Sequence, residues 1–205
     1  MKFNKTSIIL IPMAPELSSQ KLIYSNAELK DMGFSYYKIA AFVEQGILIK
    51  LNKSHYENTS FNGYLNDFYY VSAFVKEGIV CLMSAAVYYG LTTFRPDSID
   101  VAVPAKKKLS TYPENISLSL HYYSAIKLST GVQMITEGEN CFKIFDIEKT
   151  VADIISDRNK IGIEETKEVL SNYLSRSSRN INQLYRYASQ IGCLKTLKTY
   201  LEVLV

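Results

Sequence analysis

Residues Ser25–Tyr56, SNAELKDMGFSYYKIAAFVEQGILIKLNKSHY, decide the fold predicted for the first part of this chain. Ser25 carries a side chain that caps helices, and the short helical run after it stops at Gly33. A second helix is predicted over residues 34–45, followed by a glycine, which accepts the left-handed conformation that ends many helices. A β-hairpin of apolar and β-branched residues comes next. This order is that of a winged helix-turn-helix, which we expect over residues 1–60.

The second predicted helix has two different faces. Apolar side chains recur at spacings of three and four and should lie on a core. They are Tyr36, Ile39, Ala40 and Val43, flanked by Phe42. The opposite face carries Ser35, Tyr37, Lys38 and Ala41. A small polar face of this kind fits the major groove of DNA, so we predict that these four residues bind DNA.

The hairpin supplies the basic side chains of Lys50, Lys53 and His55, which we expect to contact DNA phosphates. The alternative is an ordinary helix pair whose lysine and tyrosine side chains coat the surface or bind another protein.

This hairpin also resembles a known pattern. Residues Gly46–Tyr56, GILIKLNKSHY, resemble the Gly-x-Leu-x-Arg-Leu-x-Arg-Gly-x-Tyr wing of the AbiEi-like antitoxins of type IV toxin–antitoxin systems. Lys50 and Lys53 stand where the pattern has arginine, which keeps the charge but loses the planar fork used for bidentate contacts. Ser54 stands at the glycine of the pattern, where a non-glycine residue with positive φ is disfavoured.

Composition indicates a globular protein. The 205 residues are 47% hydrophobic and 21% charged, which is enough chain for two domains and a sizeable core. The net charge of +3 is too small to establish a nucleic-acid partner. Residues 1–60 hold seven lysines against five acidic residues, whereas residues 111–205 hold eleven basic and eleven acidic residues. Any basic surface is therefore expected in the first half of the chain.

Several features favour the cytoplasm. Cys81, Cys141 and Cys193 are odd in number and widely spaced, which indicates buried, reduced thiols. The apolar run near the amino terminus is broken by a proline and lacks a cleavage site, so it is not expected to direct export. The uncharged stretch Gly78–Phe94 is shorter than the ~20 residues that span a bilayer, and it predicts a buried helix.

A domain boundary is predicted at residues 58–66, which are rich in Asn, Ser, Thr and Gly. Before it, Thr6–Ile11 resembles a strand, and Pro12 and Pro15 leave only about Pro15–Ile23 for the helix that normally supports a winged helix. The support for the second helix is therefore either this short segment, irregular chain or another segment. After the boundary, residues 67–205 predict an α+β domain with a small sheet followed by a helical bundle. Its predicted helices are 67–76, 79–89, 147–157, 163–174, 181–189 and 194–204, its predicted strands are 98–103 and 116–122, and residues 132–136 and 141–144 are predicted to form a hairpin.

Carboxylates gather in the predicted helix 147–157 and could suggest a metal site. They are Asp146, Glu148, Asp153 and Asp157. Asp146 is explained as a helix cap and Lys149 pairs with Asp153 at four-residue spacing, so no metal or other cofactor is expected. No phosphate-binding glycine loop and no nucleophile motif beside a histidine stands in the sequence. We therefore expect a protein that is not an enzyme, with a metal-dependent nuclease as the remote alternative.

The triplet Lys106, Lys107 and Lys108 is open to two interpretations. Such a run is usually a solvated loop. It could also extend a DNA-binding surface beyond the first domain.

The resemblance to AbiEi-like antitoxins continues into the second domain. Ser84–Thr92 resembles the Ser-Ala-x-x-x-His-Gly-Leu-Thr segment, with Tyr89 at the usual histidine; Glu148–Asp153 resembles a Glu-Lys-Thr-Leu-Ala-Asp helix, and Arg158–Gly162 an Arg-x-Lys-x-Gly turn.

This resemblance implies an antitoxin that represses its own operon by binding operator DNA and that counteracts a nucleotidyltransferase-like toxin, not necessarily by direct contact. It points to Glu148, Lys149, Asp153 and Arg158 as the antitoxin surface. A ligand-responsive transcriptional regulator with a sensor domain is the competing interpretation.

Overall fold

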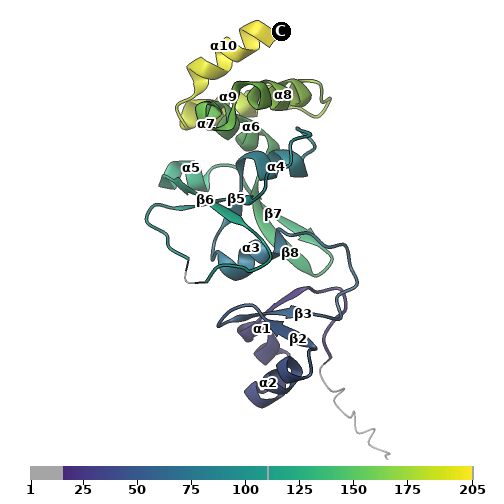
Figure 1. Cartoon of the computed structure of the whole chain (residues 1–205). Coiled ribbons are helices and arrows are strands. Elements are labelled where there is room, and N and C mark those ends of the chain that lie inside the picture. The colour runs from purple at the N-terminus through teal and green to yellow at the C-terminus, as the bar shows by residue number, and fades with distance from the viewer. Residues whose placement is uncertain (1–15, 110, 205) are drawn as a thin grey trace, which may run out of the picture.

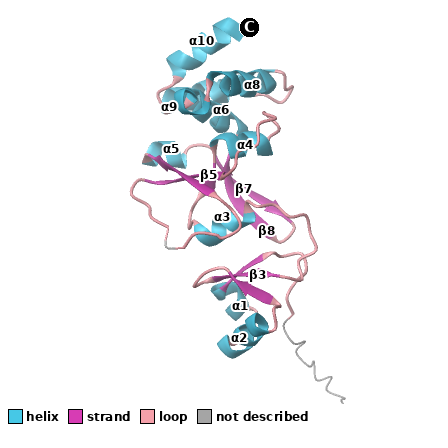
Figure 2. Ribbon diagram, in the orientation of Figure 1, coloured by secondary structure: helices cyan, strands magenta, loops and turns pink. Residues whose placement is uncertain are grey.

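A computed structural model describes residues 16–109 and 111–204. Within these ranges the chain forms two small sheets and ten helices, which confirms the α+β class (Figures 1 and 2). The predicted strand at Thr6–Ile11 and the apolar run around it lie outside the described residues. In Figure 1 the first unit lies at the bottom, the larger sheet in the middle and most of the helices at the top.

The first unit, residues 23–58, follows the order strand, two helices, two strands. Its elements are β1 (Ile23–Ser25), α1 (Asn26–Asp31), α2 (Tyr36–Glu44), β2 (Leu48–Lys50) and β3 (His55–Asn58). The three strands form an antiparallel sheet in the order β1-β3-β2. A small core joins them to the helices: Tyr24, Leu29, Phe34, Ile39, Leu48 and Tyr56.

The start of α1 follows the prediction. The Ser25 hydroxyl accepts a hydrogen bond from the backbone N–H of Glu28 at 3.2 Å, and the Glu28 carboxylate accepts one from the backbone N–H of Ser25 at 2.8 Å. This reciprocal pair satisfies two helix-end donors. Of the alternatives for the supporting segment, a helix within 16–23 does not form: residues 16–22 are irregular and β1 begins at Ile23.

The second unit, residues 69–204, begins with a sheet and ends with a bundle. Its first elements are α3 (Tyr69–Phe74), β4 (Ile79–Val80), α4 (Leu82–Tyr88), β5 (Ile99–Pro104), β6 (Leu118–Tyr123), α5 (Ala125–Ser129), β7 (Val132–Glu137) and β8 (Asn140–Phe145). The helices α6 (Ile147–Ser156), α7 (Arg158–Ile161), α8 (Ile163–Leu174), α9 (Ile181–Gln190) and α10 (Leu194–Leu204) follow. The sheet order is β6-β5-β4-β8-β7, with β5–β6 and β4–β8 parallel and the other two pairs antiparallel.

Alternate side chains of the sheet enter two cores. One core lies between the sheet and helices α4, α6, α8, α9 and α10, with Phe145 and Ile79 from the strands. The other lies between the sheet and α3, and it contains Phe142 and Ile144. Leu22 and Ile23, from the start of the first unit, are buried in this second core. The two units therefore share apolar contacts.

Polar contacts reinforce the junction between the units. Asn140, at the start of β8, accepts a hydrogen bond from the backbone N–H of Leu22 at 2.7 Å and donates one to the backbone oxygen of Gln20 at 2.8 Å. The Ser18 hydroxyl donates to Glu139 at 2.5 Å. Buried amides of this kind fix the register of two segments that lie far apart in sequence.

Tertiary contacts changed some predicted boundaries. The predicted helix 79–89 begins as strand β4, because Ile79 and Val80 fill the gap between β5 and β8. The short helices α5 and α7 were not expected. Cys141 was predicted to be buried and is exposed, because it lies near the start of β8, outside the core that Phe145 enters further along the strand, whereas Cys81 and Cys193 are buried.

Candidate nucleic-acid interface

Helix α2 starts at a capped serine. Ser35 is the residue before the helix, and its hydroxyl accepts a hydrogen bond from the backbone N–H of Lys38 at 3.2 Å. Phe34 precedes this cap and packs in the same core as Ile39, and both are buried. Such an apolar pair across a cap fixes the direction in which the chain enters the helix.

This pair also turns Tyr36 outward. Tyr36 and Ala40 were predicted to lie in the core, but Tyr36 is 65% exposed and Ala40 is exposed as well. Phe34 takes the core position because the helix begins two residues later than predicted. Tyr37 is 86% exposed, as the DNA-facing assignment requires, and Ala41 is half-buried.

Lys38 does not project freely into solvent. Its Nζ lies 4.9 Å from the ring centroid of Phe34 and 5.5 Å from that of Phe42. A cation over an aromatic face is held electrostatically as well as by contact of its aliphatic stem. Lys38 therefore stabilises the packing of α2 besides adding charge beside Tyr37.

The turn of the hairpin β2–β3 is organised by Asn52. Its side-chain oxygen accepts hydrogen bonds from the backbone N–H groups of Ser54 at 2.9 Å and His55 at 3.0 Å. Ser54 is not among the described non-glycine residues with positive φ, which are Glu77, Leu82 and Lys106. The serine at the glycine of the resembling pattern is thus accommodated, because an asparagine side chain closes the turn instead of a left-handed residue.

The same asparagine joins the hairpin to the second unit. Its Nδ2 donates a hydrogen bond to the backbone oxygen of Ala73, in α3, at 2.8 Å. Between the two segments lies a cleft of about 380 Å³, which we call the lysine cleft. It is lined by Asn52, Lys53, Ser54, His55, Ser72, Ala73, Phe74, Lys76, Lys107, Lys108 and Thr111.

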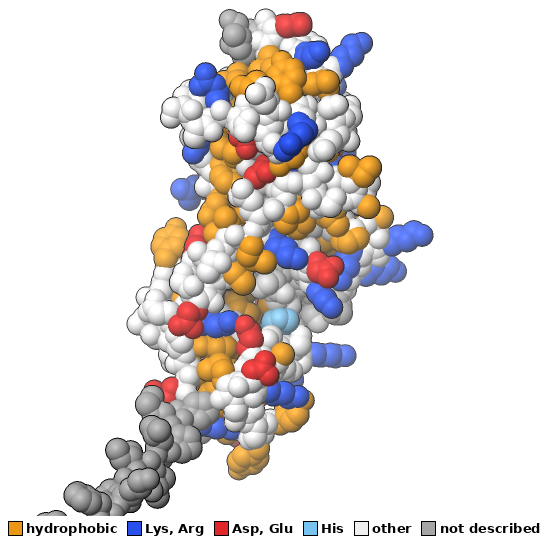
Figure 3. Space-filling view, turned by 180° about the vertical axis from the view of Figure 1, so that it is seen from behind, with side chains coloured by type: hydrophobic (Ala, Val, Ile, Leu, Met, Phe, Trp, Pro, Cys, Tyr) orange, Lys and Arg blue, Asp and Glu red, His pale blue; other side chains and the backbone are white. Residues whose placement is uncertain are grey.

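The lysine cleft gathers four of the predicted DNA-binding residues: Lys53, His55, Lys107 and Lys108. It also contains Lys76, which sequence reasoning missed because the residue stands alone at the end of α3. Lys50 and Lys106 are exposed but do not line the cleft. No Asp or Glu occurs among the described residues that line it. Figure 3 shows Lys and Arg side chains projecting along the right-hand edge of the molecule, from its lower third to its middle.

His55 adds a titratable group to this cleft. Burial lowers the pKa of its imidazole below the usual value, and the carboxylate of Glu28 only partly offsets this effect. Its Nδ1 lies 3.0 Å from the Ser54 hydroxyl. The ring therefore favours its neutral form until an anion approaches.

The predicted antitoxin surface is wrong for three of its four residues. Glu148 is 8% exposed, and Lys149 and Asp153 are completely buried in α6. Arg158 is half-buried, and its guanidinium donates to the backbone oxygen of Ile155 at 3.3 Å. Their spacing matched a solvent-facing ion pair, but α8, α9 and the sheet cover α6 on nearly every side.

Each of the four carboxylates Asp146, Glu148, Asp153 and Asp157 has at least one protein partner, although Asp153 Oδ1 accepts no hydrogen bond from any described residue. Asp146 accepts the backbone N–H of Lys149 at 2.7 Å and the hydroxyl of Tyr187 at 2.8 Å. Glu148 accepts the hydroxyl of Tyr173 at 3.1 Å. Within residues 16–109 and 111–204, no three His, Cys, Asp or Glu side chains are placed to hold a metal ion.

The other two carboxylates belong to a buried ion cluster. Asp153 pairs with Lys149, and Asp157 accepts a hydrogen bond from Lys127 at 2.7 Å. The Lys149 Nζ also lies 4.0 Å from the ring centroid of Phe145. Burial raises the pKa of Asp153 and lowers that of Lys149, although each partner opposes the other's shift. The cluster is thus part of the core, and the loss of one partner would leave a buried charge uncompensated.

His121 also lacks a catalytic arrangement. Its Nε2 lies 2.8 Å from Asp100 and 3.3 Å from the Ser119 hydroxyl. The carboxylate and the hydroxyl compete for the same ring nitrogen, whereas a serine triad needs them on opposite nitrogens. Asp100 in turn accepts a hydrogen bond from the backbone N–H of Ser84 near the start of α4, at 3.3 Å.

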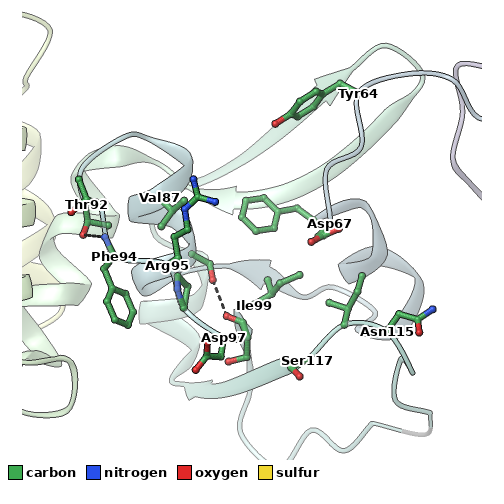
Figure 4. A pocket seen from close by; sticks show the side chains of 16 residues that line it. Tyr64, Asp67, Val87, Thr92, Phe94, Arg95, Asp97, Ile99, Asn115 and Ser117 are labelled. Carbon is green, nitrogen blue, oxygen red and sulfur yellow. Dashed lines mark hydrogen bonds between the residues drawn. The ribbon is translucent and has the colours of Figure 1, made fainter.

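A second hollow, of about 780 Å³, opens beside α4 on the second unit (Figure 4). Tyr64 lies at one end of it, and Phe94 and Arg95 lie at the other. The Thr92 hydroxyl accepts the backbone N–H of Phe94 at 3.0 Å and holds this loop. Asp67 and Asp97 add negative charge, so the hollow is mixed in polarity and differs from the lysine cleft.

Comparison with known proteins leaves the family open. No protein-family model matches the chain, and no curated protein matches it. Among solved structures it is similar to the RV2827C protein from Mycobacterium tuberculosis, with 12% identity and a TM-score of 0.40, over 89% of this chain and 76% of that one. Over the described part of the chain, none of the helices combines the length and apolar character required to cross a bilayer.

Proposed function

We propose that this protein binds duplex DNA as a winged helix-turn-helix, with α2 in the major groove and the hairpin β2–β3 against the backbone. The observation that carries this proposal is the exposed polar face of α2, where Tyr37 is 86% exposed, together with the exposed hairpin lysines Lys50 and Lys53, which form no ion pair among the described residues. Clustered cations that are not neutralised by neighbours attract the phosphate backbone.

The exposed face of α2 supports the groove contact. Tyr37 offers a hydroxyl and a ring to base edges, and the half-buried Ala41, one turn later, leaves room for close approach. The Ser35 hydroxyl is engaged in capping, so its role is to hold the start of the helix in position. Lys50, exposed on β2, and Lys53, exposed in the turn, supply sequence-independent charge.

The antitoxin role rests on the resemblance. In that role the protein represses its own operon in the cytoplasm and counteracts a nucleotidyltransferase-like toxin. The buried side chains of α6 support the fold of the second unit, and any contact with the toxin belongs to other residues.

Binding to the DNA upstream of the protein's own gene tests the proposal. Tyr37→Ala should weaken this binding at least tenfold without changing stability, since the side chain is almost fully exposed. Tyr64→Ala is the matched control, because Tyr64 is 85% exposed but lies in the second hollow. Equal affinities for the two variants would remove α2 from the interface.

A ligand-responsive regulator is the second candidate, and the hollow beside α4 favours it. Its volume falls within the ~300–1,000 Å³ range of small-molecule sites, and it combines aromatic and charged side chains. A metabolite that changes DNA affinity in the wild type and not in Arg95→Ala would support this candidate over the toxin-linked one.

A further inference from the structure

We infer that the lysine cleft is a binding site for the DNA phosphodiester backbone outside the groove contact, so that the second unit is itself part of the DNA-binding surface. This inference rests on the proposed function and deepens it. It assigns to Lys76, Lys107 and Lys108 the task of holding a flanking stretch of duplex.

The cations of the cleft come from three separate segments. Lys53 belongs to the hairpin turn, Lys76 follows α3, and Lys107 and Lys108 follow β5. None of these four lysines forms an ion pair within the described part of the chain. Glu77, the acidic neighbour of Lys76, lines a different hollow. Four lysines that line one cleft without a lining carboxylate among the described residues create a positive potential there, which an anionic occupant would neutralise.

The cleft is preformed. The hydrogen bond from Asn52 to Ala73 joins the hairpin turn directly to α3, so these two walls of the cleft are linked to each other. The third wall is set by a tight turn in which the backbone N–H of Lys107 donates to the oxygen of Pro104 at 3.2 Å. Lys106 adopts φ of 66° in this turn, a left-handed conformation that non-glycine residues rarely adopt. A preformed site loses little entropy when it binds.

The chemistry favours phosphate over base edges. Lysine is a compact point charge without the planar fork that reads guanine, so it suits phosphate oxygens of any sequence. The cleft is also continuous with the proposed groove contact, since Lys53 belongs to both the hairpin and the cleft. In Figure 1 the hairpin β2–β3 and the loop between β5 and β6 lie on the same, left-hand side of the molecule, with α2 below them. A duplex held by α2 and the hairpin therefore reaches the cleft along this side.

Two duplexes of different length test the inference. One carries the operator with both flanks, and the other is trimmed to the segment protected by α2 and the hairpin. For the double variant Lys76→Gln/Lys108→Gln we expect weaker binding to the long duplex, with the salt slope reduced by roughly two units for two lost phosphate contacts. Affinity for the trimmed duplex should be unchanged.

The control variant removes equal charge elsewhere. Lys195→Gln/Lys198→Gln affects two exposed lysines on α10, at the opposite end of the molecule, and should bind both duplexes like the wild type. A third measurement adds inorganic triphosphate as a probe. Triphosphate should compete with the long duplex in the wild type and in the control variant, but not in Lys76→Gln/Lys108→Gln.

The outcomes separate the two proposals. If Tyr37→Ala weakens binding but the cleft variant binds both duplexes normally, the DNA-binding function stands and the cleft has no part in it. If triphosphate binds the cleft without affecting the long duplex, the cleft is a small-anion site and the inference is wrong. If neither Tyr37→Ala nor Lys76→Gln/Lys108→Gln alters DNA binding, both the proposed function and the inference about the lysine cleft are wrong.

Discussion

The side-chain amide of Asn52 lies 2.8 Å from the backbone oxygen of Ala73, and this contact ties the hairpin turn to helix α3. The carbonyl end of the same side chain closes the turn through the N–H groups of Ser54 and His55. One residue therefore shapes the hairpin and joins it to the second unit.

Substitutions can separate the contribution of the Asn52 side-chain oxygen from that of its amino group. Asn52→Asp retains the oxygen that closes the turn and loses the donor to Ala73, whereas Asn52→Ala loses both. Loss of a hydrogen bond of this kind, which is partly buried, costs about 0.5–1.5 kcal/mol. We expect both variants to lower the free energy of unfolding, with Asn52→Ala lower than Asn52→Asp, as measured by urea denaturation. Identical stability for wild type and Asn52→Asp would show that the contact with α3 contributes nothing.

His55 should make DNA binding sensitive to pH. In the free protein, burial lowers the pKa of the His55 imidazole, so the ring is neutral near pH 7. Nearby DNA phosphates would favour its protonated form. Binding therefore takes up a proton, and affinity should rise as pH falls through the interval between the bound and free pKa values. The rise is at most about tenfold per pH unit for a single group. Anisotropy titrations should show it in the wild type and not in His55→Gln; a rise of the same size in His55→Gln would place the proton elsewhere.

The pair formed by Lys149 and Asp153 should behave as a core element. Asp153→Ala leaves Lys149 buried without its partner, and it leaves Lys127 with only Asp157. Breaking a buried pair from one side costs about 3–5 kcal/mol. We expect Asp153→Ala to unfold at lower denaturant concentration and the double variant Lys149→Met/Asp153→Leu to recover much of the loss. A single variant as stable as the wild type would contradict the burial of this pair.

Asp157 should contribute to acid stability. Burial raises the pKa of its carboxyl, but the hydrogen bond and charge of Lys127 outweigh that effect and hold the pKa below its usual value. A depressed acidic pKa contributes stability that is present above the unfolded pKa of about 4 and is lost as pH falls through the folded pKa. Lys127→Met should therefore be less stable than the wild type near neutral pH, with the difference shrinking in acid. A difference that stays constant with pH would mean that only packing was lost.

Removing the first unit should destabilise the second. A chain that begins at residue 67 lacks Leu22 and Ile23, which fill the core beside Phe142 and Ile144. Each lost apolar side chain removes about 1.5–3 kcal/mol of burial. We expect this truncated chain to have a lower melting temperature, measured by circular dichroism, than a chain that begins at residue 16. Equal melting temperatures would show that the second unit folds independently.

Local signals in the sequence determined much of this protein. Ser25 and Asp146 cap the helices that they were predicted to cap, and the three-and-four spacing placed α8 and α10 at their observed bounds. The caps and helix bounds depend on contacts between residues only a few positions apart, so the local sequence is enough to predict them. The hairpin of β7 and β8 follows for the same reason.

Tertiary structure decided what each helix face meets. The pattern of Glu148, Lys149 and Asp153 suits a solvated face, and it is buried because α8, α9 and the sheet surround α6. Tyr36 faces solvent because Phe34, before the cap, already fills the core. The lysine cleft unites Lys53 and Lys107 because the two units pack together, with Asn52 bound to α3 and Leu22 and Ile23 in the second core, and contacts between residues so distant along the chain leave no periodic signal in the sequence.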